Sequence, residues 1–326
     1  MKAIVYFSNG SPDVLRCEEL DKPTPGDDQV LIRVRAAALN PVDAYLVKKM
    51  PAIARKLMKM PAPTIAQPGR FGRDVAGVVE AVGVRVTQFK PGDEVFGSCP
   101  GACSEYVCAS ESKLAIKPAN VSFEEAASTP VAIYTALQGL RRGLIKPGHK
   151  VLINGASGGV GTFAVQIAKS LGAEVTGVCS TRNLELIRSI GADHVIDYSK
   201  EDFAASGPRY DLVFDCAWTH TWSAGRRAVK PGGRYVIIGG VAGGPIFKLL
   251  ARMVGARLMS HLVSQKFVTF FLAKTDQSDL DSVRDLMAEG KVKPVIDKRY
   301  PLSETPDATR YLLEGHARGK VVISVA

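Results

Sequence analysis

Three small residues stand at fixed spacing in one short segment of the sequence. The segment NGASGGVG places Ala156, Gly158 and Gly161 in the pattern AxGxxG. The middle glycine allows a tight turn and close approach of the backbone to a pyrophosphate, and the last lets a helix pack closely on the preceding strand. The N-terminus of such a helix offers N–H groups to an anion. The pattern predicts a dinucleotide site, and the alternative is an ordinary glycine-rich turn.

The elements around this segment favour the dinucleotide interpretation. VLING at 151–155 is typical of a short buried strand, apolar residues over 160–171 recur at helical spacing, and AEVTGVC at 173–179 is typical of a second strand. Strands and helices go on alternating to about residue 240, which predicts a parallel, doubly wound sheet. The expected cofactor contacts in the turn are Ala156, Ser157, Gly158, Gly159, Val160 and Gly161.

The end of the second strand indicates which dinucleotide binds. An acidic residue there would accept hydrogen bonds from the ribose hydroxyls of NADH. The chain instead has Ser180, Thr181 and Arg182, whose hydroxyls and fixed positive charge suit a 2′-phosphate. NADPH is therefore the expected cofactor. The alternative is that Ser180 and Thr181 cap the next helix and that Arg182 is solvated.

Length and composition predict two domains with sizeable cores. The chain has 326 residues, of which 46% are hydrophobic and 23% charged. The formal net charge of +10 favours anionic ligands. No segment resembles a membrane span or a signal peptide, so a cytoplasmic location is the default expectation. The six cysteines are too scattered for a disulfide framework, and the cluster Cys99, Cys103 and Cys108 lacks a fourth zinc ligand, so no metal is expected.

Many segments together resemble the zinc-independent, zeta-crystallin-like quinone oxidoreductases of the medium-chain dehydrogenase/reductase superfamily. The resemblance runs nearly end to end. Its carriers include ALNPVDAYL at 38–46, GRFGRDVAGVVEAVG at 69–83, INGASGGVG at 153–161, GADHVIDY at 191–198, PGGRYVIIGG at 231–240 and GHARGKVV at 315–322. It implies an α/β chain with a GroES-like, β-rich catalytic domain at 1–122 and 274–326, a Rossmann NADPH-binding domain at 123–273, and a homodimer.

The same resemblance argues against a zinc enzyme. Zinc-dependent relatives place cysteine where this chain has Asn40 and histidine where it has Arg73, and neither residue is a credible zinc ligand. The resemblance also places Asn40, Asp43 and Tyr45 on the nicotinamide side. Asn40 could donate to a substrate oxygen, Tyr45 could donate a hydrogen bond or a proton, and Asp43 is expected to anchor the loop. The alternative is a purely structural role for each.

Further cofactor contacts are implied by the resemblance alone. Arg318 or Lys320 would assist the 2′-phosphate, with a solvated terminal charge as the alternative. Thr135 would lie near the nicotinamide phosphate and Tyr198 against the adenine. Gly239 and Gly240 would lie beside the nicotinamide ribose.

Two stretches depart from the family pattern or vary within it. In the first, at 216–222, Trp218 could stack on a flat substrate and His220 could act as an acid, but packed aromatics and a surface histidine are the favoured interpretation. The second comprises the basic and apolar segments 48–61 and 247–259. These segments could cover a hydrophobic substrate or rest on an anionic membrane, but a flap and a packed helix with solvated charges are favoured, and no nucleic acid is expected.

The sequence as a whole predicts a metal-independent reductase that transfers hydride from NADPH to a quinone or an α,β-unsaturated carbonyl. The alternative is a non-catalytic NADPH-binding sensor or membrane-associated scaffold whose cleft has been filled at Trp218 and Trp222. A third hypothesis, a zinc alcohol dehydrogenase, would carry stoichiometric metal.

Overall fold

The chain forms two compact units. The computed structural model describes residues 1–47, 63–64, 68–205, 207–238, 255, 263–268, 273 and 276–325. Unit 1 comprises Met1–Ala132, Thr275–Gly290 and Pro294–Ala326, and unit 2 comprises Ile133–Lys274 and Lys291–Lys293. The first segment of unit 1 extends past the expected boundary at 122 because helix α3 (Phe123–Ala127) packs on the strands of that unit. No helix in these described ranges is long and apolar enough to span a bilayer.

Unit 1 is rich in β-structure, as expected. A seven-stranded sheet has the order β15-β16-β3-β5-β6-β8, with β7 paired to β3, and a smaller sheet has the order β2-β1-β4. The strands are β1 (Lys2–Tyr6), β2 (Leu15–Glu19), β3 (Gln29–Leu39), β4 (Gly69–Arg70), β5 (Asp74–Val82), β6 (Glu94–Ser98), β7 (Tyr106–Ser110), β8 (Leu114–Ile116), β15 (Ile296–Pro301) and β16 (Lys320–Ser324). The helices are α1 (Pro41–Val47), α3, α9 (Gln277–Ala288) and α10 (Thr305–Leu313), with short 3-10 turns η1 (Pro12–Val14), η2 (Glu111–Lys113) and η6 (Leu302–Glu304).

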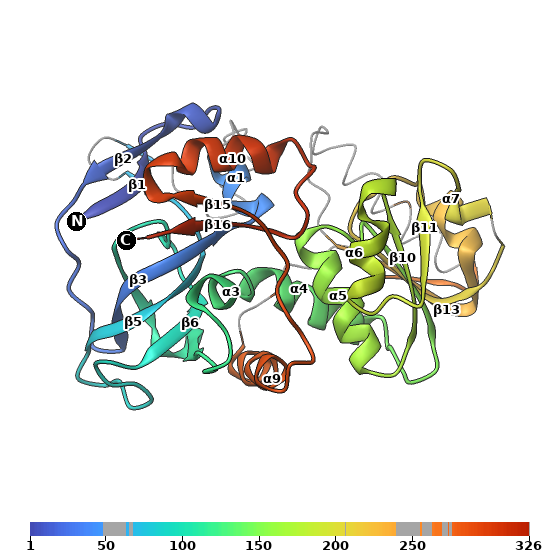
Figure 1. Cartoon of the computed structure of the whole chain (residues 1–326), viewed down its shortest axis with the longest axis horizontal. Coiled ribbons are helices and arrows are strands. Elements are labelled where there is room, and N and C mark those ends of the chain that lie inside the picture. Colours follow the sequence, from blue (N-terminus) through green and yellow to red (C-terminus); the bar gives the residue numbers. More distant parts are fainter. Residues whose placement is uncertain are drawn as a thin grey trace. The chain divides into compact units, whose positions relative to one another are not determined.

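The register of three strands brings distant residues to one edge of the large sheet. β16 pairs antiparallel with β3, with Val321 opposite Leu39, and β5 pairs antiparallel with β3, with Asp74 opposite Ala38. Figure 1 shows the red strand β16 beside the blue strand β3. The C-terminal stretch therefore pairs with the first segment of unit 1. The residue after β3, Asn40, lies at the edge where β5 and β16 begin.

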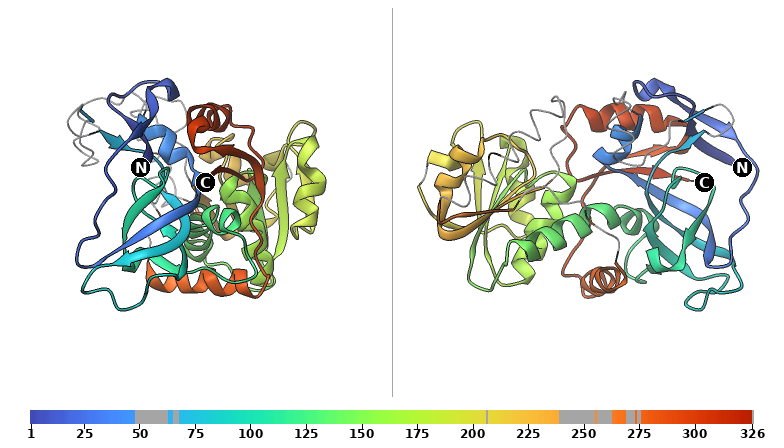
Figure 2. Two further views of the ribbon diagram at one scale, coloured as in Figure 1. Left: turned by 60° about the vertical axis from the view of Figure 1, so that its left-hand side comes forward. Right: turned by 180° about the vertical axis from the view of Figure 1, so that it is seen from behind.

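Unit 2 contains the expected doubly wound sheet. Its six strands are all parallel, in the order β11-β10-β9-β12-β13-β14, and Figure 2 shows them from two further sides. The strands are β9 (Lys150–Asn154), β10 (Glu174–Cys179), β11 (His194–Asp197), β12 (Tyr210–Asp215), β13 (Val229–Ile237) and β14 (Lys266–Val268). The helices are α5 (Gly159–Ser170), α6 (Leu184–Ser189) and α7 (Trp222–Gly225), with 3-10 turns η3 (Thr181–Asn183), η4 (Phe203–Ala205) and η5 (Arg226–Ala228). Helix α4 (Pro130–Arg142) begins in unit 1 and continues into unit 2.

Candidate functional site

The AxGxxG segment forms the turn between β9 and α5. A Cβ at Gly161 would lie 2.1 Å from the Gly155 carbonyl oxygen, so the contact between helix and turn requires glycine there. A Cβ at Gly158 would lie 3.5 Å from that oxygen, which is ordinary contact, so packing within the fold does not explain this glycine. The first turn of α5 leaves N–H groups without intrahelical acceptors. The lack of a side chain at Gly158, beside these donors, fits the close approach of a pyrophosphate.

The residues after β10 are arranged differently from a simple helix cap. Neither Ser180 before η3 nor Asn183 before α6 makes a side-chain capping hydrogen bond, so the capping alternative is not supported for Ser180. The Thr181 hydroxyl donates to Asp197 at the end of β11, and the Ser180 hydroxyl accepts from the Asn183 amide. Arg182 is exposed. Asp197 was not among the predicted site residues, although it is an acidic residue at the end of a parallel strand of the same sheet.

The remaining cofactor candidates that the structure describes belong partly to unit 2 and partly to unit 1. In unit 2, Tyr198 is 62% exposed after β11, and Thr135 is half-buried on α4. Gly239 and Gly240 lie outside the described residues. Arg318 belongs to unit 1, where its side chain is exposed and its backbone N–H donates to Asp297.

The suggestion that Lys320 assists the 2′-phosphate or is solvated is wrong. Lys320 is only 3% exposed and is ion-paired with Asp74 inside unit 1. Its position at the start of an interior strand, opposite the end of β3, buries the side chain.

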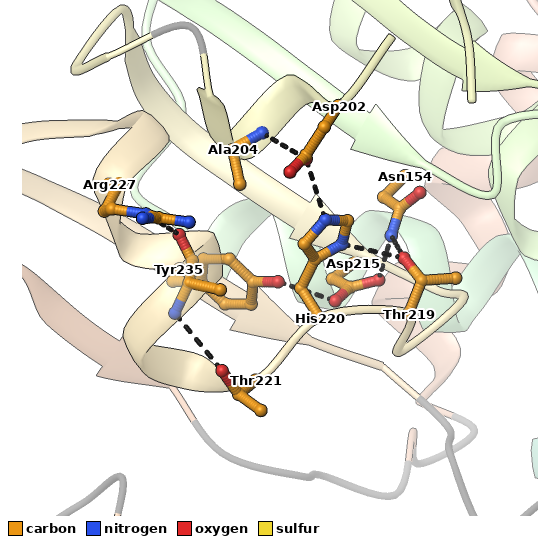
Figure 3. A network of polar contacts seen from close by, with 10 residues as sticks. Asn154, Asp202, Ala204, Asp215, Thr219, His220, Thr221, Arg227 and Tyr235 are labelled. Carbon is orange, nitrogen blue, oxygen red and sulfur yellow. Dashed lines mark hydrogen bonds and ion pairs between the residues drawn. The ribbon is translucent and has the colours of Figure 1, made fainter. Parts of the chain in front are cut away.

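The loop that follows β12 lies at the carboxyl edge of the parallel sheet, beside the glycine turn. Strands β9 and β12 are neighbours there, with Asn154 opposite Asp215. The Asn154 amide donates to Asp215 Oδ1 at 2.8 Å and to Thr219 Oγ1 at 3.1 Å, and Figure 3 shows these contacts. Tyr235 donates its hydroxyl to the other Asp215 oxygen at 2.7 Å. The chain runs from β9 outwards to β10 on one side and from β12 outwards to β13 on the other. Open α/β sheets bind ligands at the carboxyl ends of two such strands.

His220 anchors the far end of the same loop. Its Nε2 lies 2.8 Å from Asp202 Oδ1 and its Nδ1 lies 2.9 Å from Thr219 Oγ1 (Figure 3). The ring also packs on Phe203 with centroids 4.4 Å apart. Both ring nitrogens therefore make hydrogen bonds, so His220 holds the loop in place and is not a freely solvated surface side chain.

The two tryptophans of this region pack, as the favoured interpretation expected. Trp222 contacts Tyr235 edge-on and Phe267 at a tilt, and both tryptophans lie against the hydrophobic core of unit 2. Trp218 adopts a left-handed backbone conformation, with φ of 55°, and its indole N–H donates to the Ile238 carbonyl at 3.3 Å. The basic segment 48–61, and all of 247–259 except Gly255, lie outside the described residues.

A buried polar cluster occupies the edge of the large sheet in unit 1. The Asn40 Nδ2 donates to Asp74 Oδ2 at 2.8 Å, and the Lys320 ammonium donates to Asn40 Oδ1 at 2.6 Å and to Asp74 Oδ2 at 3.2 Å. Asp43, on the first turn of α1, accepts the backbone N–H of Asn40 at 2.8 Å. This contact stabilises the start of the helix and ties Asp43 to the residue before the helix. The importance of Asp74 and Lys320 was not predicted.

Burial shifts the pKa of two candidates, Asp43 in this cluster and Tyr45 on the same helix. Burial, followed by the nearby Asp74 charge, raises the pKa of the Asp43 carboxyl to about 7. The other Asp43 oxygen, Oδ1, is buried without a hydrogen-bond partner. Burial also raises the pKa of the half-buried Tyr45 phenol. At neutral pH Tyr45 therefore keeps its proton and can act as a donor.

These groups do not fit a zinc ion. The Asn40 oxygen already accepts from the Lys320 ammonium, and the Asp74 carboxylate is paired with the same ammonium. Within the described ranges no three His, Cys, Asp or Glu side chains are grouped to hold a metal.

Comparisons with known proteins agree with this architecture. A family described as alcohol dehydrogenase GroES-like domain matches residues 26–119, and one described as zinc-binding dehydrogenase matches residues 190–323. The NADPH-dependent alkenal/one oxidoreductase of Arabidopsis thaliana is 37% identical over 99% of this chain and 79% of its own length.

Solved structures give the same result. The quinone oxidoreductase of Coxiella burnetii is 31% identical, with a TM-score of 0.86 over 100% of this chain and 99% of its own. The quinone oxidoreductase of Escherichia coli, solved with NADPH, is 26% identical with a TM-score of 0.81 over 99% and 100% of the two chains. The chain belongs to the quinone oxidoreductase family of the medium-chain dehydrogenase/reductase superfamily.

Proposed function

We propose that the protein is an NADPH-dependent reductase of quinones or α,β-unsaturated carbonyls. The observation that carries the proposal is the turn between β9 and α5, in which packing requires the glycine at 161 but does not require the one at 158. Relatives named for alkenal/one and quinone reduction support the substrate class, and the names that include NADPH support the cofactor.

When bound, NADPH supplies a hydride to the conjugated substrate, and negative charge develops on the substrate oxygen. The chain's part is to bind both molecules and to stabilise that charge. Asn40 uses one Nδ2 hydrogen for Asp74, and its second is the donor we assign to the substrate oxygen. The protonated Tyr45 hydroxyl supplies a second hydrogen bond or the proton. Asp43 holds the turn that carries Asn40.

In the cofactor unit, the backbone of 156–161 receives the pyrophosphate, and Ser180 and Arg182 receive the 2′-phosphate. No observation favours the non-catalytic alternative. Its premise was a cleft filled at Trp218 and Trp222, but Trp222 is packed against Tyr235 and Phe267 within unit 2.

The test follows the near-ultraviolet absorbance of NADPH in the presence of naphthoquinones, short enones and enoyl thioesters. We expect turnover with at least one of these classes and tighter binding of NADPH than of NADH. Tight NADPH binding without turnover on any class would refute the reductase and support a sensor.

We also propose that the protein is a cytoplasmic homodimer. Membership of the family supports the dimer, and the six cysteines, all within the described ranges and all free thiols, suit a reducing compartment. Light scattering of the purified protein and fractionation of its cells test the two statements.

A further inference from the structure

The Lys320 side chain is buried in unit 1 although lysine is a residue of the protein surface. Its side chain is 3% exposed, and that of its partner Asp74 is fully buried. A charge removed from water is unfavourable unless it is paired and hydrogen-bonded. Lys320 meets that condition through two acceptors, Asp74 Oδ2 and Asn40 Oδ1. A buried ammonium does not contribute to solubility as a surface lysine does. Its two contacts therefore indicate a role inside unit 1.

The two charged partners determine the orientation of the Asn40 amide. An ammonium can only donate hydrogen bonds, so Oδ1 of Asn40 must face Lys320, and a carboxylate can only accept, so Nδ2 must face Asp74. A flipped amide would set its NH₂ group against the ammonium and its oxygen against the carboxylate. Both contacts therefore favour the same rotamer, and that rotamer keeps one Nδ2 hydrogen in addition to the one that Asp74 accepts.

We propose that Lys320 is a positioning residue that fixes the Asn40 amide with its Nδ2 end as the hydrogen-bond donor for the substrate oxygen. This inference rests on the function proposed above, in which Asn40 contacts the substrate. Lys320 acts only through Asn40. The cation of the cluster is thus part of the chain itself, held on strand β16, and not an exchangeable metal ion.

A double-mutant cycle on turnover tests the proposal. The variants are Lys320→Met, Asn40→Leu and the two combined, assayed with saturating NADPH and the best quinone or enone. We expect each single change to lower kcat about 10- to 100-fold, as loss of a transition-state donor does, and to leave the KM for NADPH unchanged. The combined variant should match Asn40→Leu to within about twofold, because Lys320 has nothing left to orient. Losses that multiply, or a fully active Lys320→Met, would overturn the proposal.

Two matched variants separate positioning from folding. Lys320→Met leaves the Asp74 carboxylate buried without its counter-charge, so Lys320→Met with Asp74→Asn removes both charges together. We expect this neutral pair to fold and to bind NADPH like the wild type, yet to lose turnover. Lys320→Arg keeps charge and donors and should restore turnover to within about tenfold of wild type. Full activity of the neutral pair would contradict the proposal.

A spectroscopic readout does not depend on activity. In protein labelled with ¹⁵N-asparagine, the Asn40 side-chain NH₂ signal is identified by its loss in Asn40→Leu. We expect its hydrogen exchange to be slow in the wild type and at least about tenfold faster in the neutral pair, because the amide is no longer held. If the wild type reduces no quinone or enone, the proposed function fails, whereas unchanged exchange shows that Lys320 does not hold Asn40.

Discussion

Replacing either of two glycines of the same turn by alanine should impair a different property: stability at Gly161 and NADPH binding at Gly158. At Gly161 the new Cβ would lie 2.1 Å from the Gly155 carbonyl oxygen and 2.8 Å from Ala156 backbone atoms. Backbone atoms cannot swing aside, so helix α5 must move by on the order of 1 Å. Such overpacking costs about 2–3 kcal/mol, which corresponds to a fall in Tm of about 4–12 °C for a unit of this size.

Gly158 is the matched control. Its backbone is extended, with φ of −82° and ψ of 174°, which alanine adopts freely, and its new Cβ would make only ordinary contact. A small loss at the helix N-cap is offset by reduced freedom of the unfolded chain, so Tm should stay within about 3 °C of wild type. The added methyl group instead keeps the pyrophosphate away from the backbone donors. Loss of one charge-assisted hydrogen bond weakens binding by about 1.5–3 kcal/mol, so the Kd for NADPH should rise roughly 10- to 100-fold.

Thermal unfolding and calorimetric titration with NADPH of both variants decide the matter. Wild-type NADPH affinity in Gly158→Ala would refute the role of this turn in binding. Wild-type stability in Gly161→Ala would refute the packing argument.

Three further predictions concern single groups. Arg182→Ala should raise the Kd for NADPH about 10- to 100-fold and barely change that for NADH, and equal losses in the two titrations would show a role in the fold. The pKa of the Asp43 carboxyl is raised to about 7 in the folded protein. The stability that its protonated form contributes is therefore lost as the pH rises from the pKa of the unfolded chain to that of the folded protein. Asp43→Asn should therefore reduce the fall in unfolding free energy between pH 5 and pH 8 by about 3 kcal/mol, measured by urea denaturation, and an unchanged pH profile would show that Asp43 does not titrate there. Dialysis against a strong zinc chelator should leave turnover and Tm unchanged, because Asn40 and Lys320 already satisfy each other, and loss of either on dialysis would contradict this.

The parts of the molecule governed by local sequence could be predicted. Buried apolar runs such as VLI at 151–153 identify the parallel strands, and the spacing of Gly158 and Gly161 identifies the turn that follows. The segment at 320–324 was assigned to the first domain through the family resemblance, and in the structure it pairs with β3.

The polar cluster could not be predicted because it depends on register. Asn40 and Lys320 are 280 positions apart, and nothing local to Lys320 distinguishes it from the exposed Arg318 two positions earlier. Only the pairing of β16 with β3 turns one basic residue inward. Asp197 escaped notice for a similar reason, since its contact with Thr181 requires the neighbouring strand β10.

The place of β16 in the sheet has a consequence for synthesis on the ribosome. This strand lies between β15 and β3, so β15 cannot join the large sheet until residues 320–324 leave the exit tunnel. Until then Asp74 also lacks its counter-charge. Nearly all of unit 2, by contrast, is one continuous stretch, Ile133–Lys274, and its helices and parallel strands can form while the last fifty residues are still being translated. The nascent chain is therefore expected to bind NADPH before it can turn over substrate.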